Sequence, residues 1–376
     1  MKDLLDSFIS KIISGIALIL AAAVGSALPA EEEADHSIVS LTYLYGGTSE
    51  IYRRNIERTK GNLTTVCPDY FEITELGGLK VLDKTDPVFI KEVQKSNIKV
   101  TPFLSNHWDR TLARKALANR RNLAIQLASA VRNYNLDGVD IDIENINGED
   151  RENYTEFIKL IREALPKDKS LTVCVAANPW GTNKGWQGAY DYKALAKYVD
   201  HIFIMTYDEH YPGGDPGPVA SLSFIEDSIK YALQHVPPEK IVLGIPFYGR
   251  YWDTTVKGSA LTVSDIESLT SRYDSTLWYD TQNECARATL IITQQNVTQG
   301  LWGGKKIPAG TYDIWYENER SYQKKVSLVK KYKLKGVGSW ALGQEPASLW
   351  EVYREWIEGL PFWDISRHWA QQYIID

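Results

Sequence analysis

Three acidic residues, Asp140, Asp142 and Glu144, alternate with apolar ones within the segment Asp137–Glu144. Side chains on a strand point alternately to its two faces, so these three carboxyls share one face and lie roughly 7 Å apart. Burial and neighbouring negative charge both favour the protonated form of a carboxyl, so at least one of the three is expected to stay protonated near neutral pH. A strand with this pattern indicates proton transfer, with Glu144 at its catalytic end as the foremost candidate.

Three further roles are open to these acids. A calcium-binding loop would need a glycine where Asn145 stands and a bidentate glutamate where Arg151 stands. A magnesium or manganese site would need companion acids at the ends of the neighbouring strands, and the sequence offers none there. A structural ladder of acids would need arginine partners close by. Proton transfer is the interpretation that we favour, and it requires no metal and no cofactor.

The elements that would hold this segment follow a strand-then-helix order. Apolar residues recur at helical spacing in 123–134, 154–165, 224–233 and 349–356, and short apolar runs typical of buried parallel strands lie among them. Eight such units predict an α/β protein, a closed (β/α)8 TIM barrel with its active site at the carboxyl ends of the strands. The predicted strands are Ser37–Tyr45, Asn62–Thr74, Ile98–Leu104, Leu136–Glu144, Leu171–Ala177, His201–Tyr207, Ile241–Tyr248 and Gly336–Leu342.

One connection is much longer than the few residues that usually join a strand to its helix. Between the seventh predicted strand and the helix near Glu319 lie residues 251–316, with strand-like stretches such as Leu277–Tyr279 and Ile307–Trp315. We therefore expect a small insertion between strand 7 and helix 7, on the side of the barrel that holds the active site. The catalytic barrel as a whole should span residues 36–360.

The amino terminus has the pattern of an export signal. Ile12–Val24 is an apolar run, preceded by two lysines and followed by small residues up to Ala30. This run is shorter than the about 20 residues that span a bilayer and has the size of a signal-peptide core, although Asp3 and Asp6 are unusual ahead of one. We expect residues 1–30 to be a signal peptide or an N-terminal anchor, and the protein to be secreted or held at the cell surface.

Composition and charge narrow the range of partners. The chain of 376 residues carries 42 Lys and Arg against 48 Asp and Glu, a net charge of -6. It lacks the basic excess that neutralises phosphates, which argues against a nucleic-acid partner. Three cysteines, Cys67, Cys174 and Cys285, are too few and too scattered for a disulfide framework or a zinc site. The 12 Trp and 22 Tyr suit stacking against flat ligand faces such as sugar rings.

Four motifs together resemble a known family. The segment Asp137–Glu144 has the form DxxDxDxE, and MTYD at Met205–Asp208, GIPFYGR at Gly244–Arg250 and GSWA at Gly338–Ala341 follow at the ends of later predicted strands. In this order they are similar to glycoside hydrolase family 18, the chitinase-like hydrolases, over about residues 38–358. The resemblance implies a TIM-barrel glycosidase whose partner is a polysaccharide containing N-acetylglucosamine.

The resemblance also implies a role for each matched residue. Glu144 falls on the general acid, Asp142 on the acid that orients the substrate's 2-acetamido group and stabilises its charge, and Asp140 on the buried proton-sharing neighbour. Tyr207 falls on the hydroxyl donor to the acetamido oxygen, and Asp208 on an adjacent substrate contact. Hydrolysis in this family retains the anomeric configuration and uses the acetamido group as nucleophile.

The other matched residues are expected to bind substrate. Trp340 falls on the tryptophan that forms the floor under the reacting sugar, and Met205 belongs to the sixth-strand motif. Tyr248 and Arg250, in the seventh-strand motif, are equally open to a structural role. For Tyr207 and Trp340 the alternatives are a core tyrosine and a side chain that only fills the barrel.

Departures from the family pattern bear on the substrate. The third predicted strand ends in Thr101–Asn106, without the SxGG of many family chitinases, and Asn145 stands where those enzymes tend to carry an aromatic residue. Together with Trp315–Ser321, these features resemble the bacterial branch that acts on cell wall or spore cortex. Peptidoglycan and chitin both remain open as substrates.

The carboxyl-terminal residues 361–376 form a separate tail. Within it, Pro361–Ala370 resembles the opening of a bacterial surface-layer homology repeat. Two interpretations remain: an incomplete repeat that associates with the cell wall, or a chance amphipathic tail.

Two alternatives to a secreted hydrolase involve no catalysis. One is a catalytically inactive, lectin-like barrel that binds chitin or peptidoglycan, in which the position of Glu144 is usually substituted. The other is a cell-surface or spore-coat protein in which the barrel is only a scaffold, and changes at Glu144 would then have no effect.

Overall fold

The computed structural model describes residues 38–253, 257–294, 306–346 and 348–358. The signal peptide or anchor predicted at 1–30 and the tail predicted at 361–376 lie outside these residues. Within the described ranges, none of the helices has the length and apolar character needed to cross a bilayer.

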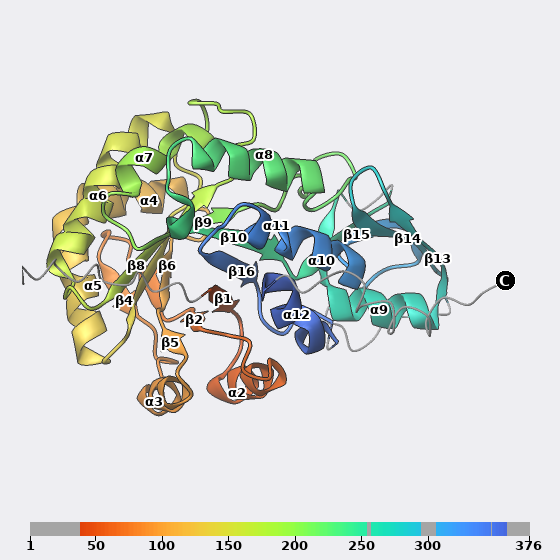
Figure 1. The fold of residues 1–376 in the computed structure, drawn as a ribbon, viewed down its shortest axis with the longest axis horizontal. Helices are drawn as coiled ribbons and strands as arrows, with labels where there is room; N and C mark the ends of the chain where they lie inside the picture. The colour runs from red at the N-terminus through yellow and green to blue at the C-terminus, as the bar shows by residue number, and fades with distance from the viewer. Residues whose placement is uncertain (1–37, 254–256, 295–305, 347, 359–376) are drawn as a thin grey trace, which may run out of the picture. The chain divides into compact units, whose positions relative to one another are not determined.

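The main sheet closes into a barrel of parallel strands, as predicted (Figure 1). Its strand order is β4-β3-β6-β7-β8-β9-β10-β16-β1-β2-β5, and only β4 is antiparallel to its neighbour. The two ends of this order are continuous, because β2 leads into β3, and β5 into β6, after two residues each. The strands are β1 (Val39–Leu44), β2 (Thr65–Pro68), β3 (Phe71–Ile73), β4 (Leu79–Val81), β5 (Lys99–Val100), β6 (Phe103–Ser105), β7 (Gly138–Asp142), β8 (Ser170–Ala176), β9 (His201–Met205), β10 (Ile241–Pro246) and β16 (Gly336–Trp340).

Helices lie outside the barrel strands and cover them (Figure 1). The apolar stripe of each helix packs on the outward face of the sheet, where Val139 and Ile141 of β7 join a large core. Side-chain caps fix where several helices begin; Asp109, for example, accepts the Leu112 N–H at 3.0 Å. The helices around the barrel are α2 (Ser49–Arg58), α3 (Pro87–Lys95), α4 (Arg110–Ala118), α5 (Arg120–Asn133), α6 (Arg151–Ala164), α7 (Tyr192–Leu195), α8 (Leu222–Leu233), α10 (Glu319–Val326), α11 (Leu328–Lys331) and α12 (Leu349–Glu358).

The long connection after β10 forms a second, antiparallel sheet with the order β12-β11-β15-β14-β13. One face of this sheet packs on α9, where Ile266 and Leu269 meet Leu290 and Ile314 in a separate core. The elements are β11 (Tyr248–Trp252), β12 (Ser259–Thr262), α9 (Val263–Arg272), β13 (Asp274–Asp280), β14 (Cys285–Ile292) and β15 (Gly310–Tyr316).

The second sheet begins earlier than the predicted insertion. The seventh barrel strand, β10, ends at Pro246 rather than at Tyr248. The Phe247 N–H still donates to the Trp340 carbonyl of the barrel, at 2.8 Å. Tyr248 then pairs with Thr262 of β12, so the chain has changed sheets before residue 251.

The acid-bearing strand β7 is also shorter than predicted. Its last residue is Asp142, and Glu144 lies in the loop beyond it. The neighbouring strand β6 ends at Ser105, which is paired with Asp142, so β6 offers no partner further along. Asn145 has a φ of +56°, a left-handed conformation that turns the chain away from the strand.

Candidate active site

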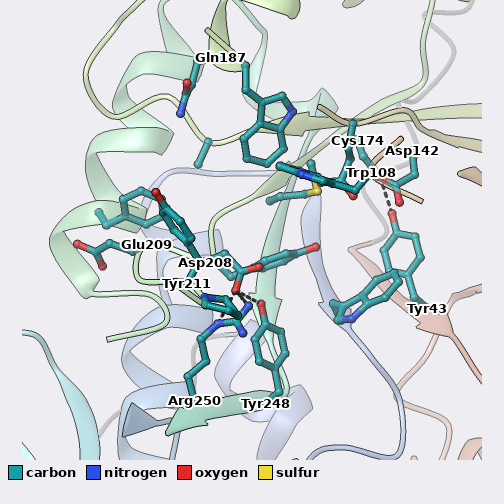
Figure 2. Close-up of a pocket in the computed structure, with 18 of the residues that line it drawn as sticks. Tyr43, Trp108, Asp142, Cys174, Gln187, Asp208, Glu209, Tyr211, Tyr248 and Arg250 are labelled. Atoms are coloured by element: carbon teal, nitrogen blue, oxygen red, sulfur yellow. Dashed lines mark hydrogen bonds and ion pairs between the residues drawn. The ribbon is translucent and has the colours of Figure 1, made fainter. Parts of the chain in front are cut away.

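A cleft of about 780 Å³ opens at the carboxyl ends of the barrel strands (Figure 2). That volume suits a ligand of several hundred cubic ångströms, such as a short stretch of a sugar chain. Residues from four loops that are far apart in sequence meet in its wall. Eight of the nine predicted site residues line it: Asp142, Glu144, Met205, Tyr207, Asp208, Tyr248, Arg250 and Trp340.

The ninth predicted residue, Asp140, lies inside the barrel and has 0% of its surface exposed. Its carboxylate accepts from the Tyr43 hydroxyl at 3.0 Å and from the Cys174 thiol at 3.3 Å. The more distant thiol of Cys67 lies 3.8 Å away. Burial raises the pKa of Asp140 to about 6, although the hydrogen bonds from Cys174 and Tyr43 oppose the rise. These partners are neutral donors, so the site suits a carboxyl that gains and loses a proton.

Asp142 ends β7 on its inner face, as the alternation predicts, and Glu144 follows in the loop beyond it; both line the cleft. Burial, and then the charge of Asp140, raise the pKa of Asp142 to about 7. The Oδ1 atom of Asp142 is buried and has no hydrogen-bond partner among the described residues. Burial, followed by the charges of Asp142 and Asp208, raises the pKa of Glu144 well above its usual value. Burial and the neighbouring negative charges thus favour the protonated form of Glu144 at the cleft wall.

A second group of matched residues is connected by hydrogen bonds around Asp208. Its Oδ1 accepts from the Tyr248 hydroxyl at 2.5 Å and from Arg250 at 2.5 Å and 3.1 Å (Figure 2). Tyr207 lies beside Tyr248, with ring centroids 6.2 Å apart. Arg250 neutralises Asp208 while also lining the cleft, so its structural and substrate-facing interpretations are compatible.

Trp340 ends strand β16 at the base of the cleft. Its ring lies 5.3 Å from that of Tyr43 and 5.3 Å from that of Tyr45, measured between centroids. Met205 ends β9 and contributes an apolar side chain to the same wall. Trp340 keeps part of its surface open, which leaves a ring face for a ligand rather than only for the core.

Several aromatic residues of the cleft were not predicted from the sequence. Trp108 and Trp186 meet edge to face, with centroids 5.0 Å apart at 76°. Trp180 and Tyr211 also line the cleft and are largely exposed. The high tryptophan content was the only signal, because loop residues carry no periodicity that places them. Exposed rings on both walls favour a sugar chain as the ligand.

The described residues contain no group of three or more His, Cys, Asp or Glu side chains arranged to hold a metal ion. The cysteines at 67, 174 and 285 are all buried free thiols.

Comparison with known proteins identifies the family. The model of Glycosyl hydrolases family 18 matches residues 42–345, which contain every predicted site residue.

Individual relatives agree with this match. The uncharacterized glycosylase YvbX of Bacillus subtilis (strain 168) is 28% identical over 351 residues, covering 90% of this chain and 97% of the relative. The cortical fragment-lytic enzyme of the same organism is 28% identical over 237 residues, covering 60% of this chain but only 50% of the relative.

Solved structures share the fold. A chitinase from Chromobacterium violaceum ATCC 12472 superposes with a TM-score of 0.76 and 27% identity, over 86% of this chain and 100% of the chitinase. The Bacillus cereus spore cortex-lytic enzyme SleL superposes with a TM-score of 0.73 and 22% identity, over 85% of this chain and 74% of SleL. The acid row, the cleft and these matches lead to one conclusion: the chain belongs to glycoside hydrolase family 18 and is a chitinase-like glycosidase.

Proposed function

We propose that this protein is a secreted hydrolase that cleaves β-1,4 linkages beside N-acetylglucosamine in peptidoglycan or chitin. The observation that carries the proposal is the series of three acids that runs from the barrel interior to the cleft wall. Burial raises the pKa of Asp140 to about 6 and that of Asp142 to about 7, and burial also raises the pKa of Glu144, at the cleft wall, well above its usual value. Such a row can hold and pass protons at neutral pH.

In the first step, Glu144 gives its proton to the glycosidic oxygen as the bond from that oxygen to the anomeric carbon breaks. The carbonyl oxygen of the 2-acetamido group attacks the same carbon and forms a cyclic oxazolinium. Asp142 accepts a hydrogen bond from the acetamido N–H and stabilises the positive charge of the oxazolinium. The Tyr207 hydroxyl donates a hydrogen bond to the acetamido oxygen. Glu144, now ionised, then takes a proton from the water that opens the ring, so the product keeps the β configuration.

The positions of the carboxyls support attack by the substrate itself. An enzyme nucleophile would need to lie about 5 Å from the acid, across the sugar. Asp142 ends strand β7 two residues before Glu144, on the same stretch of chain as the acid. Asp208 is already engaged by Tyr248 and Arg250. The acetamido group is therefore the nucleophile that we propose.

The relatives support both substrates. One is named a cortical fragment-lytic enzyme and a structural neighbour is named a chitinase, and N-acetylglucosamine is common to peptidoglycan and chitin. The export pattern in residues 1–30 supports action outside the membrane. The tail at 361–376 would then serve attachment to the cell wall.

A catalytically inactive, lectin-like barrel is the alternative. Such a protein would share the aromatic cleft, but binding alone does not require a carboxyl with a raised pKa at the cleft wall. The presence of Glu144 with that raised pKa favours the hydrolase.

The proposal is tested by digesting purified peptidoglycan and N-acetylglucosamine oligomers side by side, with products identified by mass and their first anomer by NMR. We expect new reducing ends at N-acetylglucosamine and the β anomer first. An α anomer first would refute the mechanism, and no product from either polymer would favour the lectin. Amino-terminal sequencing of the exported protein should give a start near Leu28 or Glu31; an intact Met1 on cytosolic protein would refute export.

A further inference from the structure

The peptide of Glu144 lies beyond the sheet that holds the other two acids. The last residue pair between β6 and β7 is Ser105 with Asp142. β6 therefore has no residue that could bind the N–H and C=O of Glu144. The way in which these two backbone groups are held determines the direction of the Glu144 side chain. Another group must therefore form hydrogen bonds with the Glu144 backbone, as strand β6 does with the backbone of Asp140 and Asp142.

Asn106, the residue directly after β6, supplies that group. Its Oδ1 accepts from the Glu144 N–H at 2.7 Å, and its Nδ2 donates to the Glu144 carbonyl at 2.9 Å. The same Nδ2 also donates to the Asp109 carbonyl at 2.9 Å, which fixes the amide to the start of α4. Asn106 is 0% exposed, so water does not compete for these bonds. One side chain thus binds both the N–H and the C=O of Glu144, as a neighbouring strand would.

The carbonyls on either side of Glu144 are also held by side chains. The Tyr190 hydroxyl donates to the Ile143 carbonyl at 2.8 Å, and the Arg110 Nε donates to the Asn145 carbonyl at 2.6 Å. Arg110 is exposed, and Tyr190 holds only the preceding residue. Asn106 alone, among these three, contacts the backbone of Glu144 itself.

We propose that Asn106 is a positioning residue that aims the carboxyl of Glu144 at the glycosidic oxygen. This inference rests on the acid role proposed for Glu144. A displacement of about 1 Å in a catalytic group lowers a rate by roughly 100-fold. Loss of the Asn106 bonds should therefore act on proton donation and leave sugar binding almost unchanged.

The test compares two substrates that differ in how much acid assistance they need. For Asn106→Ala we expect kcat on N-acetylglucosamine oligomers to fall by about 100-fold with KM nearly constant. On a nitrophenyl glycoside, whose leaving group departs with little help from an acid, the fall in kcat/KM, which reports cleavage of the glycosidic bond and not the later water step, should be less than about threefold. Equal losses on both substrates would show that Asn106 serves only the fold, and would overturn the proposal.

Asn178 provides a matched control. Its side chain makes the same pair of bonds to another loop peptide, with Nδ2 to the Thr182 carbonyl at 2.8 Å and Oδ1 from the Thr182 N–H at 3.0 Å. It is 1% exposed, and these two hydrogen bonds go to Thr182 rather than to Glu144. Asn178→Ala should change KM at most, and its effect should be the same on the oligomers and on the nitrophenyl glycoside.

A second variant covers the case in which Asn106→Ala fails to fold. In Asn106→Asp, the introduced carboxyl can donate to the Glu144 carbonyl only when it is protonated. Its activity relative to the wild type should therefore rise as pH falls, and a flat ratio would overturn the proposal. Glu144→Gln separates a failure of the acid role from a failure of the positioning role. Full activity of Glu144→Gln refutes the acid role of Glu144. A large loss in Glu144→Gln together with unchanged activity of Asn106→Ala refutes only the positioning role of Asn106.

Discussion

Two of the carboxyls that are completely buried within the described residues have partners of different kinds. Glu317 lies between β15 and α10, and its carboxylate accepts from the ammonium of Lys325; both residues are 0% exposed. Asp140 is equally buried in the barrel, but its partners are the hydroxyl of Tyr43 and the thiol of Cys174. Burial raises the pKa of both carboxyls; the opposite charge of Lys325 opposes this rise at Glu317, whereas only hydrogen bonds from neutral groups oppose it at Asp140.

This difference separates a structural acid from a chemical one. A buried ion pair with good geometry holds its charges fixed, and removing one partner leaves the other uncompensated. A buried carboxyl that has only neutral donors changes its protonation state near the pH at which the protein works. The two kinds of site should therefore respond differently to substitution and to pH.

The largest effect is expected at the acid row. Glu144→Gln removes the donated proton, so kcat should fall by about 10²–10⁴ while oligomers of N-acetylglucosamine still bind. Steady-state kinetics and calorimetry measure the two quantities. Glu149→Gln, at a largely exposed side chain, is the control and should keep its activity. A variant of Glu144 with wild-type kcat would refute its role as the acid.

At the ion pair, the effect should fall on stability instead. Lys325→Met leaves the carboxylate of Glu317 buried without its cation, so the free energy of unfolding should drop by about 3–5 kcal/mol. Adding Glu317→Leu should restore most of it, because an apolar pair of similar size needs no compensation. Urea unfolding gives the values. Failure of the second substitution to rescue the first would show that the pair has another role.

The stability of the protein should depend on pH through the buried carboxyl of Asp140. The pKa of Asp140 is raised from 3.8 to about 6 in the folded state, so the folded protein binds this proton more tightly than the unfolded chain does. Its contribution is therefore fully present below about pH 4 and is lost as pH rises through 6. An asparagine at position 140 does not titrate, so the Asp140→Asn variant does not lose this contribution. Its free energy of unfolding relative to that of the wild type should therefore rise between pH 4 and 7, by at most roughly 3 kcal/mol. Unfolding curves at several pH values measure it, and a relative stability that falls with pH would contradict the assignment.

The smallest effect is expected for the aromatic floor. Trp340→Ala should weaken binding of N-acetylglucosamine oligomers, since a stacked ring contributes on the order of 1 kcal/mol beyond its buried area. Trp278→Ala, on the insertion sheet and away from the lining of the cleft, is the matched control. Calorimetry that finds equal affinities in the two variants would assign Trp340 to the core instead.

Local patterns account for what could be predicted from the sequence. Alternation in β7 was enough to place Asp140 and Asp142 on the inner face and Val139 on the outer one, and the repeated strand-then-helix order was enough for the barrel. Both features depend on residues that are close together in the chain.

The rest depends on contacts between distant segments. Glu144 was expected on the strand, yet the strand ends where its neighbour β6 ends, which only the pairing reveals. Tyr248 and Arg250 were assigned to the seventh strand region but belong to the second sheet. Asn106 is a single asparagine at a strand end, and nothing in its surroundings in sequence signals that it binds Glu144.

The most direct test of the proposed chemistry compares two oligomers that differ only at the reacting sugar, one with a 2-acetamido group and one with a free amine. Turnover of each by the purified protein is measured at the same pH and concentration. We expect cleavage of the acetylated oligomer alone, because the amine has no carbonyl oxygen to attack the anomeric carbon. Comparable cleavage of the two would contradict the proposal that the row ending at Glu144 acts together with the substrate's own nucleophile.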